Sequence, residues 1–263
     1  MSRIVCLASA AVLVWLVAGT ADSQPTPLRV CADPDNLPFS NQQLEGFENK
    51  IATVIAGELG TTVSYFWWPH QRGLVRNTLR ADECDVLVGI PKGYDLVTWT
   101  KPYYRSTYVL AYPKAKGYQI TSLDAPVLKQ IKIGVHNNTP AQDVLAEHGI
   151  LDNVVIYSLF HDPRNPNEGP LKLLSDLTAG KIDAGVAWGP MAGYFVKKRN
   201  APLEVMPLPS EAKIPLAFDI SMGVRKGDQA LKDRLEAALD ARQADIRKIL
   251  EDYGVPMLPM ATK

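Results

Sequence analysis

Side chains that could bind a ligand follow the ends of several predicted strands. Carboxylates and amides follow the first strand, aromatic and basic residues follow the second and third, and a run of amides precedes a helix in the later half. Together they predict a wide, aromatic-rich cleft that accepts a large ligand or a segment of a protein. The set consists of Asp33, Asp35, Asn36, Asn41, Trp67, Trp68, Arg72, Arg76, Lys92, Tyr94, Asn137, Asn138, Thr139 and Trp188.

Ordinary structural roles are the alternative for parts of this set. In that interpretation, one of Trp67 and Trp68 packs in the core and the other covers the hinge, and residues 137–139 only cap the helix that follows. The free N–H groups at the same helix start can instead hold an anion. Arg72 and Arg76 share one helix face, which is either functional or simply solvated.

The chain lacks the patterns that common catalytic and metal sites need. No His pair has the spacing of a zinc-binding helix, and neither G-x-S-x-G nor a phosphate-binding loop occurs. Asp33-Pro34-Asp35 lacks the remaining ligands of a calcium loop. We therefore expect no enzymatic activity and no bound metal or cofactor. The four histidines are His70, His136, His148 and His161.

The formal net charge of the chain is zero, because 28 Lys and Arg balance 28 Asp and Glu among 263 residues. Balanced charge argues against binding to nucleic acid or to an anionic membrane surface. The composition, 46% hydrophobic and 21% charged, is typical of a globular protein and not of a disordered one. Docking through local polar and aromatic surface is therefore expected.

The N-terminus has the three regions of a secretory signal peptide. Arg3 precedes an apolar run over residues 4–17, which is short for a membrane span because a span needs about 20 residues. Gly19-Thr20-Ala21 supplies the small residues of a cleavage site. We predict that residues 1–21 are removed and that the mature protein is periplasmic, without membrane insertion. An uncleaved anchor is the alternative.

Two of the three cysteines remain after that cleavage, because Cys6 lies in the predicted signal peptide. In an oxidising compartment, Cys31 and Cys84 are expected to form a disulfide. Closing a loop of this length is worth about 4 kcal/mol in the loop-entropy description. The alternative is a pair of buried, unpaired thiols.

Strands and helices alternate along the chain in two β-α-β-α-β blocks, which is typical of parallel sheets. The first block has strands at 28–32, 62–67 and 85–89 and helices at 47–59 and 71–80. The second block has strands at 131–135, 154–157 and 184–188 and helices at 140–147 and 171–178. We therefore predict an α/β protein of two lobes, each a sheet with flanking helices.

Two further strands connect the blocks. Residues 106–112 lead out of the first block to a polar turn, and residues 218–224 lead back to a long helix over 229–253. In the simplest closure, the first lobe comprises residues 22–112 and 216–263 and the second lobe comprises residues 113–215. Two strands then cross between the lobes as a hinge, with the binding cleft at the carboxyl ends of the strands.

The order of these segments resembles the type II periplasmic binding proteins, also called solute-binding protein family 3, over about residues 27–258. It implies a two-lobed receptor that binds its ligand between the lobes. The matching segments are residues 28–33, Gly46-Phe47-Glu48, 84–89, 101–104, 180–184 and 189–192.

Longer strings are similar to one subgroup, the J proteins of methanol dehydrogenase gene clusters, MxaJ and XoxJ. Trp67-Trp68-Pro69 is nearer to the XoxJ branch, which accompanies lanthanide-dependent enzymes. The resemblance implies a periplasmic accessory protein whose partner is a PQQ-dependent methanol or alcohol dehydrogenase, a quinoprotein, or its cytochrome. The strings are residues 31–41, 67–73, 75–79, 93–95 and 102–109.

Two charged anchors of amino-acid receptors are missing when the chain is aligned to this family. Residues 91–95 contain no Arg to pair with a ligand carboxylate, and Trp188 stands where an Asp usually meets the ligand amine. Burying a free amino acid without these partners is costly, although Lys92 could supply a cation. The alternative function is an importer's receptor for a small polar solute other than an ordinary amino acid.

Overall fold

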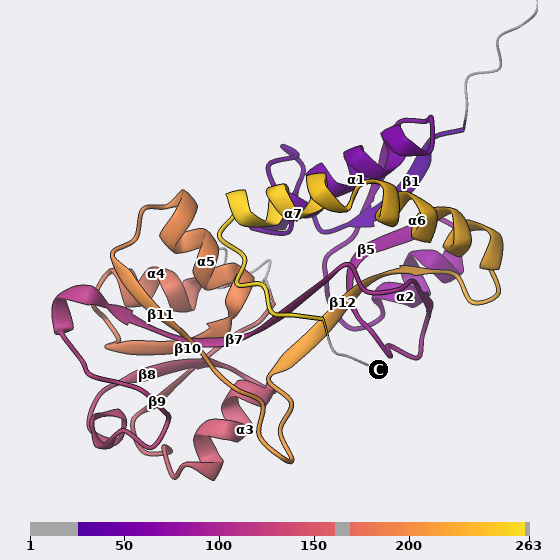
Figure 1. Ribbon diagram of the computed structural model, residues 1–263. Helices are drawn as coiled ribbons and strands as arrows, with labels where there is room; N and C mark the ends of the chain where they lie inside the picture. The colour runs from indigo at the N-terminus through magenta and orange to yellow at the C-terminus, as the bar shows by residue number, and fades with distance from the viewer. Residues whose placement is uncertain (1–25, 161–168, 261–263) are drawn as a thin grey trace, which may run out of the picture.

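The computed structural model describes residues 26–160 and 169–260. Two lobes lie on either side of the strands that connect them (Figure 1). The predicted signal peptide, residues 1–21, lies outside the described residues, and so do Cys6 and His161. No helix in the described ranges is both long enough and apolar enough to cross a membrane.

The first lobe is built on a parallel sheet with the order β4-β1-β5. Strand β1 (Leu28–Ala32) pairs with β4 (Val63–Trp67) and β5 (Val86–Pro91). Helix α1 (Phe47–Glu58) connects β1 to β4 and places its apolar face in the main core. The hairpin of β2 (Asp35–Asn36) and β3 (Ser40–Asn41) lies between β1 and α1 in the chain.

The predicted helix over residues 71–80 is wrong in its extent. The structure has a four-residue helix α2 (Leu74–Asn77) and then a 3-10 turn η1 (Leu79–Ala81). Gly73 has a φ of 92°, and Thr78 has φ −125° and ψ −91°, so neither residue continues an α-helix. The Thr78 hydroxyl donates to the carbonyl oxygen of Leu74 at 2.7 Å, which closes the short helix.

The second lobe has a parallel core with the order β10-β8-β9. Strand β8 (Ile133–His136) lies between β9 (Val154–Tyr157) and β10 (Ala184–Trp188). The remaining elements of this lobe are α3 (Pro140–Glu147), α4 (Lys172–Thr178), α5 (Gly189–Lys198) and β11 (Leu203–Pro207). Short connecting elements elsewhere are β6 (Thr98–Trp99), η2 (Lys114–Lys116) and η3 (Pro126–Lys129).

Strand β7 (Tyr104–Pro113) joins the lobes. Residues 104–107 pair with β12 (Ala217–Val224), and residues 108–111 pair with β10. The strands therefore form one path, β4-β1-β5-β12-β7-β10-β8-β9, where a separate sheet in each lobe was expected. The reason is the length of β7, because ten extended residues span roughly 33 Å and reach both halves of the molecule.

The predicted single helix over residues 229–253 is two helices in the structure. Helix α6 (Gln229–Ala241) ends at Arg242, whose φ of −111° and ψ of 20° depart from helical values, and α7 (Gln243–Asp252) follows. Both helices pack against α1. Tyr253, the next residue after α7, stacks on Tyr194 of α5 with ring centroids 6.3 Å apart.

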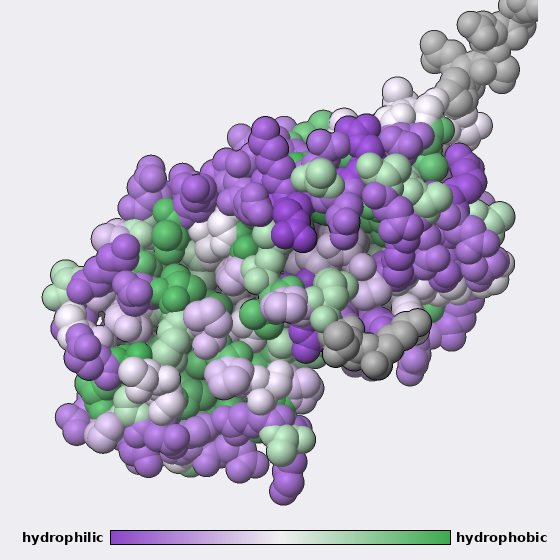
Figure 2. All heavy atoms as spheres, in the orientation of Figure 1, coloured by the Kyte–Doolittle hydropathy of each residue, from purple (hydrophilic) through white to green (hydrophobic). Residues whose placement is uncertain are grey.

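The main apolar core extends through both lobes. It contains Phe47 and Ile51 of α1 together with Leu173 and Leu174 of α4, all with no exposed surface. Figure 2 shows hydrophilic residues over α6 and α7, whereas the hydrophobic residues visible on that face lie mainly over the second lobe. Continuous packing and the shared strand path hold the two lobes together.

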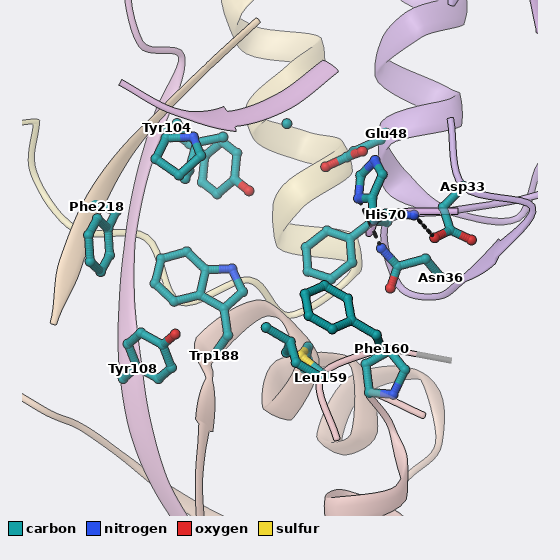
Figure 3. Close-up of a pocket in the computed structure, with 16 residues that line it drawn as sticks. Asp33, Asn36, Glu48, His70, Tyr104, Tyr108, Leu159, Phe160, Trp188 and Phe218 are labelled. Atoms are coloured by element: carbon teal, nitrogen blue, oxygen red, sulfur yellow. Dashed lines mark hydrogen bonds between the residues drawn. The ribbon is translucent and has the colours of Figure 1, made fainter. Parts of the chain in front are cut away.

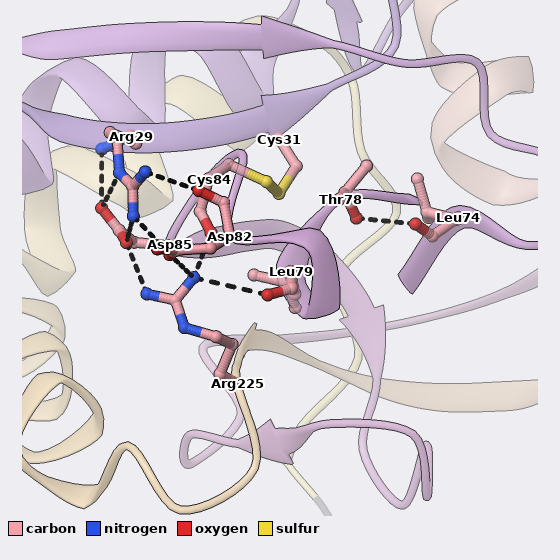
Figure 4. Close-up of a disulfide and its surroundings, with 9 residues drawn as sticks. All are labelled: Arg29, Cys31, Leu74, Thr78, Leu79, Asp82, Cys84, Asp85 and Arg225. Carbon is pink, nitrogen blue, oxygen red and sulfur yellow. Dashed lines mark hydrogen bonds and ion pairs between the residues drawn. A yellow bond between two sulfur atoms is a disulfide. The ribbon is translucent and has the colours of Figure 1, made fainter. Parts of the chain in front are cut away.

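Cys31 and Cys84 form the predicted disulfide, with their Cα atoms 5.5 Å apart (Figure 4). The bond joins β1 to the turn before β5, inside a small apolar cluster of the first lobe. Beside it, the Asp85 carboxylate accepts hydrogen bonds from Arg29 and from Arg225, each at 2.7 Å. Because Arg225 directly follows β12, this ion network also fixes the end of the chain segment that crosses back between the lobes.

Candidate functional site

A pocket of about 330 Å³ lies where the two lobes meet (Figure 3). Its size is within the range of small-molecule sites, roughly 300–1,000 Å³. Asp33, Asn36 and Trp188 are the members of the predicted set that line it. The full lining is Asp33, Asn36, Phe39, Glu48, His70, Gly89 and Pro91 from the first lobe, Tyr104, Tyr108, Phe218 and Ile220 from the crossing strands, and Leu159, Phe160, Pro170, Trp188 and Met191 from the second lobe.

Asp33 holds two loops of the pocket together. Its Oδ1 accepts a hydrogen bond from the N–H of Asp35 at 2.9 Å, and its Oδ2 accepts one from the N–H of His70 at 2.6 Å. Burial lowers the pKa of His70, although the Asp33 carboxylate acts in the other direction. The imidazole is therefore neutral at pH 7, and its Nδ1 lies 3.5 Å from Nδ2 of Asn36.

Glu48 places a buried carboxyl group in the pocket. It lies in the first turn of α1, and the residue is only 7% exposed. Within the described part of the chain, no side chain or backbone group forms a hydrogen bond or ion pair with this carboxyl group. Burial raises the pKa of Glu48 to about 8, and the nearby Asp33 carboxylate adds to the rise. The group is therefore mostly protonated at pH 7.

Aromatic rings form the other side of the pocket (Figure 3). Trp188 precedes α5 and contacts Tyr108 and Phe218 edge to face, with ring centroids 5.3 and 5.9 Å apart. Burial raises the pKa of Tyr108 to about 12 and holds the pKa of Tyr104 well above its usual range, so both phenols are neutral. These neutral aromatic side chains, the aromatic wall, therefore lie across the pocket from the carboxyl groups of Asp33 and Glu48.

Asp35 and Asn41 lie beside the pocket but outside its lining. They pair with each other across the β2–β3 hairpin. The Asn41 side chain donates to the carboxylate of Glu45 and accepts from the Glu45 N–H, each at 2.8 Å. Asn41 therefore fixes the entry to α1.

Trp67 and Trp68 also lie outside the lining and pack within the first lobe. Trp67 stacks on Tyr65 with centroids 4.7 Å apart, and Trp68 stacks on Phe66 with centroids 6.4 Å apart. The indole N–H of Trp68 is buried and has no hydrogen-bond partner among the described residues. Both side chains are half-buried, so neither lies fully in the core.

The basic residues of the predicted set do not reach the pocket. Arg72 and Arg76 are exposed around α2, so the solvated alternative fits their surroundings. Nζ of Lys92 lies 5.7 Å from the centre of the Trp99 ring. Tyr94, at 36% exposure, belongs to the same surface loop. No Lys or Arg is present in the described lining.

The run at residues 137–139 likewise lies apart from the pocket lining. Asn137 and Asn138 are exposed, and Asn138 has a φ of 55°. Thr139 is the N-cap of α3, but its hydroxyl donates to the carbonyl oxygen of His136 at 2.8 Å and does not accept from the helix. Ordinary side-chain capping by Thr139 is therefore wrong.

Glu48 and most of the aromatic wall were not selected from the sequence. Glu48 did carry a signal, because it shares the helical spacing of the buried positions Ile51, Ala52 and Ile55. A charged residue on an apolar helix face is a candidate for a special role. No three His, Cys, Asp or Glu side chains in the described ranges are grouped so that they could hold a metal ion.

Known proteins resemble this chain over most of its length. The family model for bacterial extracellular solute-binding proteins, family 3, matches residues 28–256. Protein MoxJ of Methylorubrum extorquens strain AM1 is 36% identical over 248 residues, which is 89% of this chain and 82% of that protein.

Two crystal structures show the same fold. MxaJ from Methlophaga aminisulfidivorans MPT is 30% identical with a TM-score of 0.78, covering 88% of this chain and 100% of that one. The periplasmic binding protein XoxJ from Methylobacterium extorquens AM1 is 39% identical with a TM-score of 0.74, covering 88% of this chain and 99% of that one. The resemblance to the MxaJ and XoxJ subgroup is thereby confirmed. This chain belongs to the bacterial extracellular solute-binding proteins of family 3.

Proposed function

We propose that this chain is a non-enzymatic periplasmic accessory protein of a PQQ-dependent methanol or alcohol dehydrogenase of the lanthanide type. It binds or activates the enzyme through the cleft between its lobes. The similarity to proteins named MoxJ, MxaJ and XoxJ supports this role, and XoxJ is described as a periplasmic binding protein. Export by the signal peptide at residues 1–21 belongs to the same proposal.

The lining of the pocket carries the argument against amino-acid transport. None of its described residues is Lys or Arg, and Trp188 is part of the lining. The resemblance to amino-acid receptors implies that Trp188 stands where those receptors usually have an amine-binding Asp. A free amino acid would therefore bury its carboxylate without a cationic partner among the described lining residues, which is costly. A binding-protein fold that has lost these anchors is better suited to a protein partner than to amino-acid capture.

We assign residues 22–112 and 216–263 to the first lobe and residues 113–215 to the second. The pairing of β7 with β12 on one side and with β10 on the other supports this division. The exposed members of the predicted set lie outside the pocket lining, and we propose them as contact points for the dehydrogenase or its cytochrome in addition to the cleft. They are Arg72, Arg76, Lys92, Tyr94, Asn137 and Asn138.

Capture from the native periplasm tests the partner. Tagged mature protein should recover a quinoprotein dehydrogenase or its cytochrome, and recovery of only a permease would contradict the proposal. An Arg72→Ala/Arg76→Ala variant should recover less of the enzyme. Lys50→Ala/Lys248→Ala is the matched control, because it removes two exposed cations outside the proposed contact surface.

The second candidate function is an importer's receptor for a small polar solute other than an ordinary amino acid. It is favoured by the family and by a pocket whose lining comes from both lobes. It predicts a rise in melting temperature with one member of a solute panel and a more compact shape in X-ray scattering. A complete panel without a shift would count against it.

A further inference from the structure

We propose that the pocket between the lobes is a binding site for a small organic monocation. The ligand is an amine or quaternary ammonium ion with an apolar body and no carboxylate. This inference goes beyond the dehydrogenase partner and does not depend on it. It rests on the juxtaposition of an unpartnered buried carboxyl group and a wall of aromatic rings.

The Glu48 carboxyl group is the anchor of this site. More than nine-tenths of the residue is buried, and its side chain points into the pocket (Figure 3). It has no hydrogen-bond or ion-pair partner among the described residues, and it lines the pocket, so a ligand there can reach it. A ligand cation with N–H donors would supply a charge-assisted hydrogen bond, and a quaternary cation would supply the opposite charge.

The aromatic wall suits the rest of such a ligand. Trp188, Tyr108 and Phe218 contact one another edge to face and line the pocket. Ring faces attract cations, and Trp does so most strongly. The same rings offer apolar contact to an aliphatic or aromatic body, so both parts of the ligand meet matching surface.

The charges of the lining select against other ligands. Asp33 and Glu48 are its acidic residues, His70 is neutral, and no Lys or Arg is present in the described lining. Among the described lining residues, a carboxylate ligand would meet two carboxyl groups and no cationic side chain. Asp33 is a weaker anchor for a ligand cation than Glu48, because each of its oxygens already accepts a backbone N–H group. One positive charge is therefore the best match.

Binding of a cation must ionise Glu48, whose pKa is about 8. The proton is released to solvent, so affinity for a permanent cation rises with pH until the carboxyl group is already ionised. The tyrosines around it have raised pKa values and remain neutral over this range, and His70 remains neutral above pH 7. The titratable groups that face Glu48 are Asp33, Tyr65, His70, Tyr103 and Tyr104.

Titration calorimetry on the mature protein tests the site with four probes of one shape: benzyltrimethylammonium, benzylamine, benzyl alcohol and benzoate. The two cations should bind more tightly than benzyl alcohol by at least tenfold, and benzoate should not bind. Benzyltrimethylammonium should bind at least tenfold more tightly at pH 9 than at pH 6. Runs in buffers of different ionisation enthalpy should show proton release at pH 7.

Two variants separate the site from a general effect. Glu48→Gln should weaken binding of the cations at least tenfold and remove the pH dependence. Glu251→Gln, which neutralises an exposed residue of α7, should change neither. Equal binding of benzyl alcohol and benzyltrimethylammonium, no binding of either cation at millimolar concentration, or unchanged binding by Glu48→Gln would each overturn the inference. A protein that captures the dehydrogenase but fails these tests overturns the inference alone.

Discussion

Gly89 of β5 and Glu48 of α1 approach so closely that a Cβ atom on Gly89 would lie 1.9 Å from Oε1 of Glu48. The absent side chain of one residue therefore makes room for the buried carboxyl group of the other. The atom that would be met is the end of a flexible side chain, which can move. A larger residue at position 89 should displace the carboxyl group and leave the fold intact.

Gly89→Ala should fold with a loss of about 1–3 kcal/mol in unfolding free energy, as is usual for overpacking. It should also lose binding of benzylamine, because the displaced Glu48 side chain occupies the pocket. Urea denaturation and calorimetry measure the two effects. Gly57→Ala is the control, since nothing lies within 4 Å of its new Cβ atom. Benzylamine binding by Gly89→Ala at wild-type affinity would refute this account.

Glu48→Gln should change how stability depends on pH. The unfolded chain releases this proton near pH 4.5 and the folded chain only near pH 8, so the folded state holds the extra proton in between. The free energy of unfolding therefore falls as pH rises through this window, by up to about 1.4 kcal/mol per unit. Gln resembles the protonated acid and does not titrate.

The variant should therefore match the wild type near pH 4.5 and exceed it in stability at pH 8. Urea midpoints measured every half unit between these values give the difference. Glu251→Gln should follow the wild type throughout. If the difference in unfolding free energy between Glu48→Gln and the wild type stays constant with pH, the carboxyl group in the folded protein titrates normally and this account is wrong.

Removing the disulfide should cost about 4 kcal/mol, because it closes a long loop in the unfolded chain. The Cys31→Ala/Cys84→Ala variant should show this loss in urea denaturation. Wild-type protein with reductant should unfold at a similar midpoint. Alkylation of the unfolded, non-reduced wild type should label no thiol in the mature chain, and two labelled thiols would contradict the bond.

Asp85 should stabilise the protein at neutral pH and make its stability sensitive to acid. Burial alone would raise the pKa of Asp85, but hydrogen bonds from Arg29 and Arg225 outweigh burial and hold that pKa below its usual range. The unfolded state therefore binds this proton more readily, so the stabilisation is present above about pH 4 and is lost as pH falls through the folded pKa. Asp85→Asn should lower the melting temperature at pH 7 and have a smaller effect at pH 2. Asp152→Asn, at an exposed position, should leave the melting temperature unchanged at both pH values.

Local periodicity made most of the fold predictable. The apolar spacing of Phe47, Ile51 and Ile55 predicts α1, and all three are fully buried. The ends of two helices were not predictable in this way. The backbone angles of Thr78 and Arg242 interrupt these helices although the side-chain pattern continues past them. Periodicity reports which face is buried and not whether each residue keeps helical angles.

The pocket was only partly predictable from the sequence. Some of its residues follow predicted strands directly, whereas others reach it only because of how the strands cross between the lobes. Asp33 and Trp188 follow strands directly, and the rule that ligands bind at strand ends finds them. Tyr108 and Phe218 lie within strands, and their place in the pocket depends on how β7 crosses between the lobes. The exposed cations Arg72 and Lys92 follow strands as well, but their side chains lie elsewhere.

Tyr104 and Tyr108 lie four residues apart on β7, yet the first is paired with Ile220 of β12 and the second with Trp188 of β10. Strand pairing therefore anchors each of these tyrosines to a different lobe, and both line the pocket. Any bend of β7 between them changes the spacing of the two rings. A change in the bend of β7 would therefore alter the width of the pocket and the angle between the outer surfaces of the two lobes together.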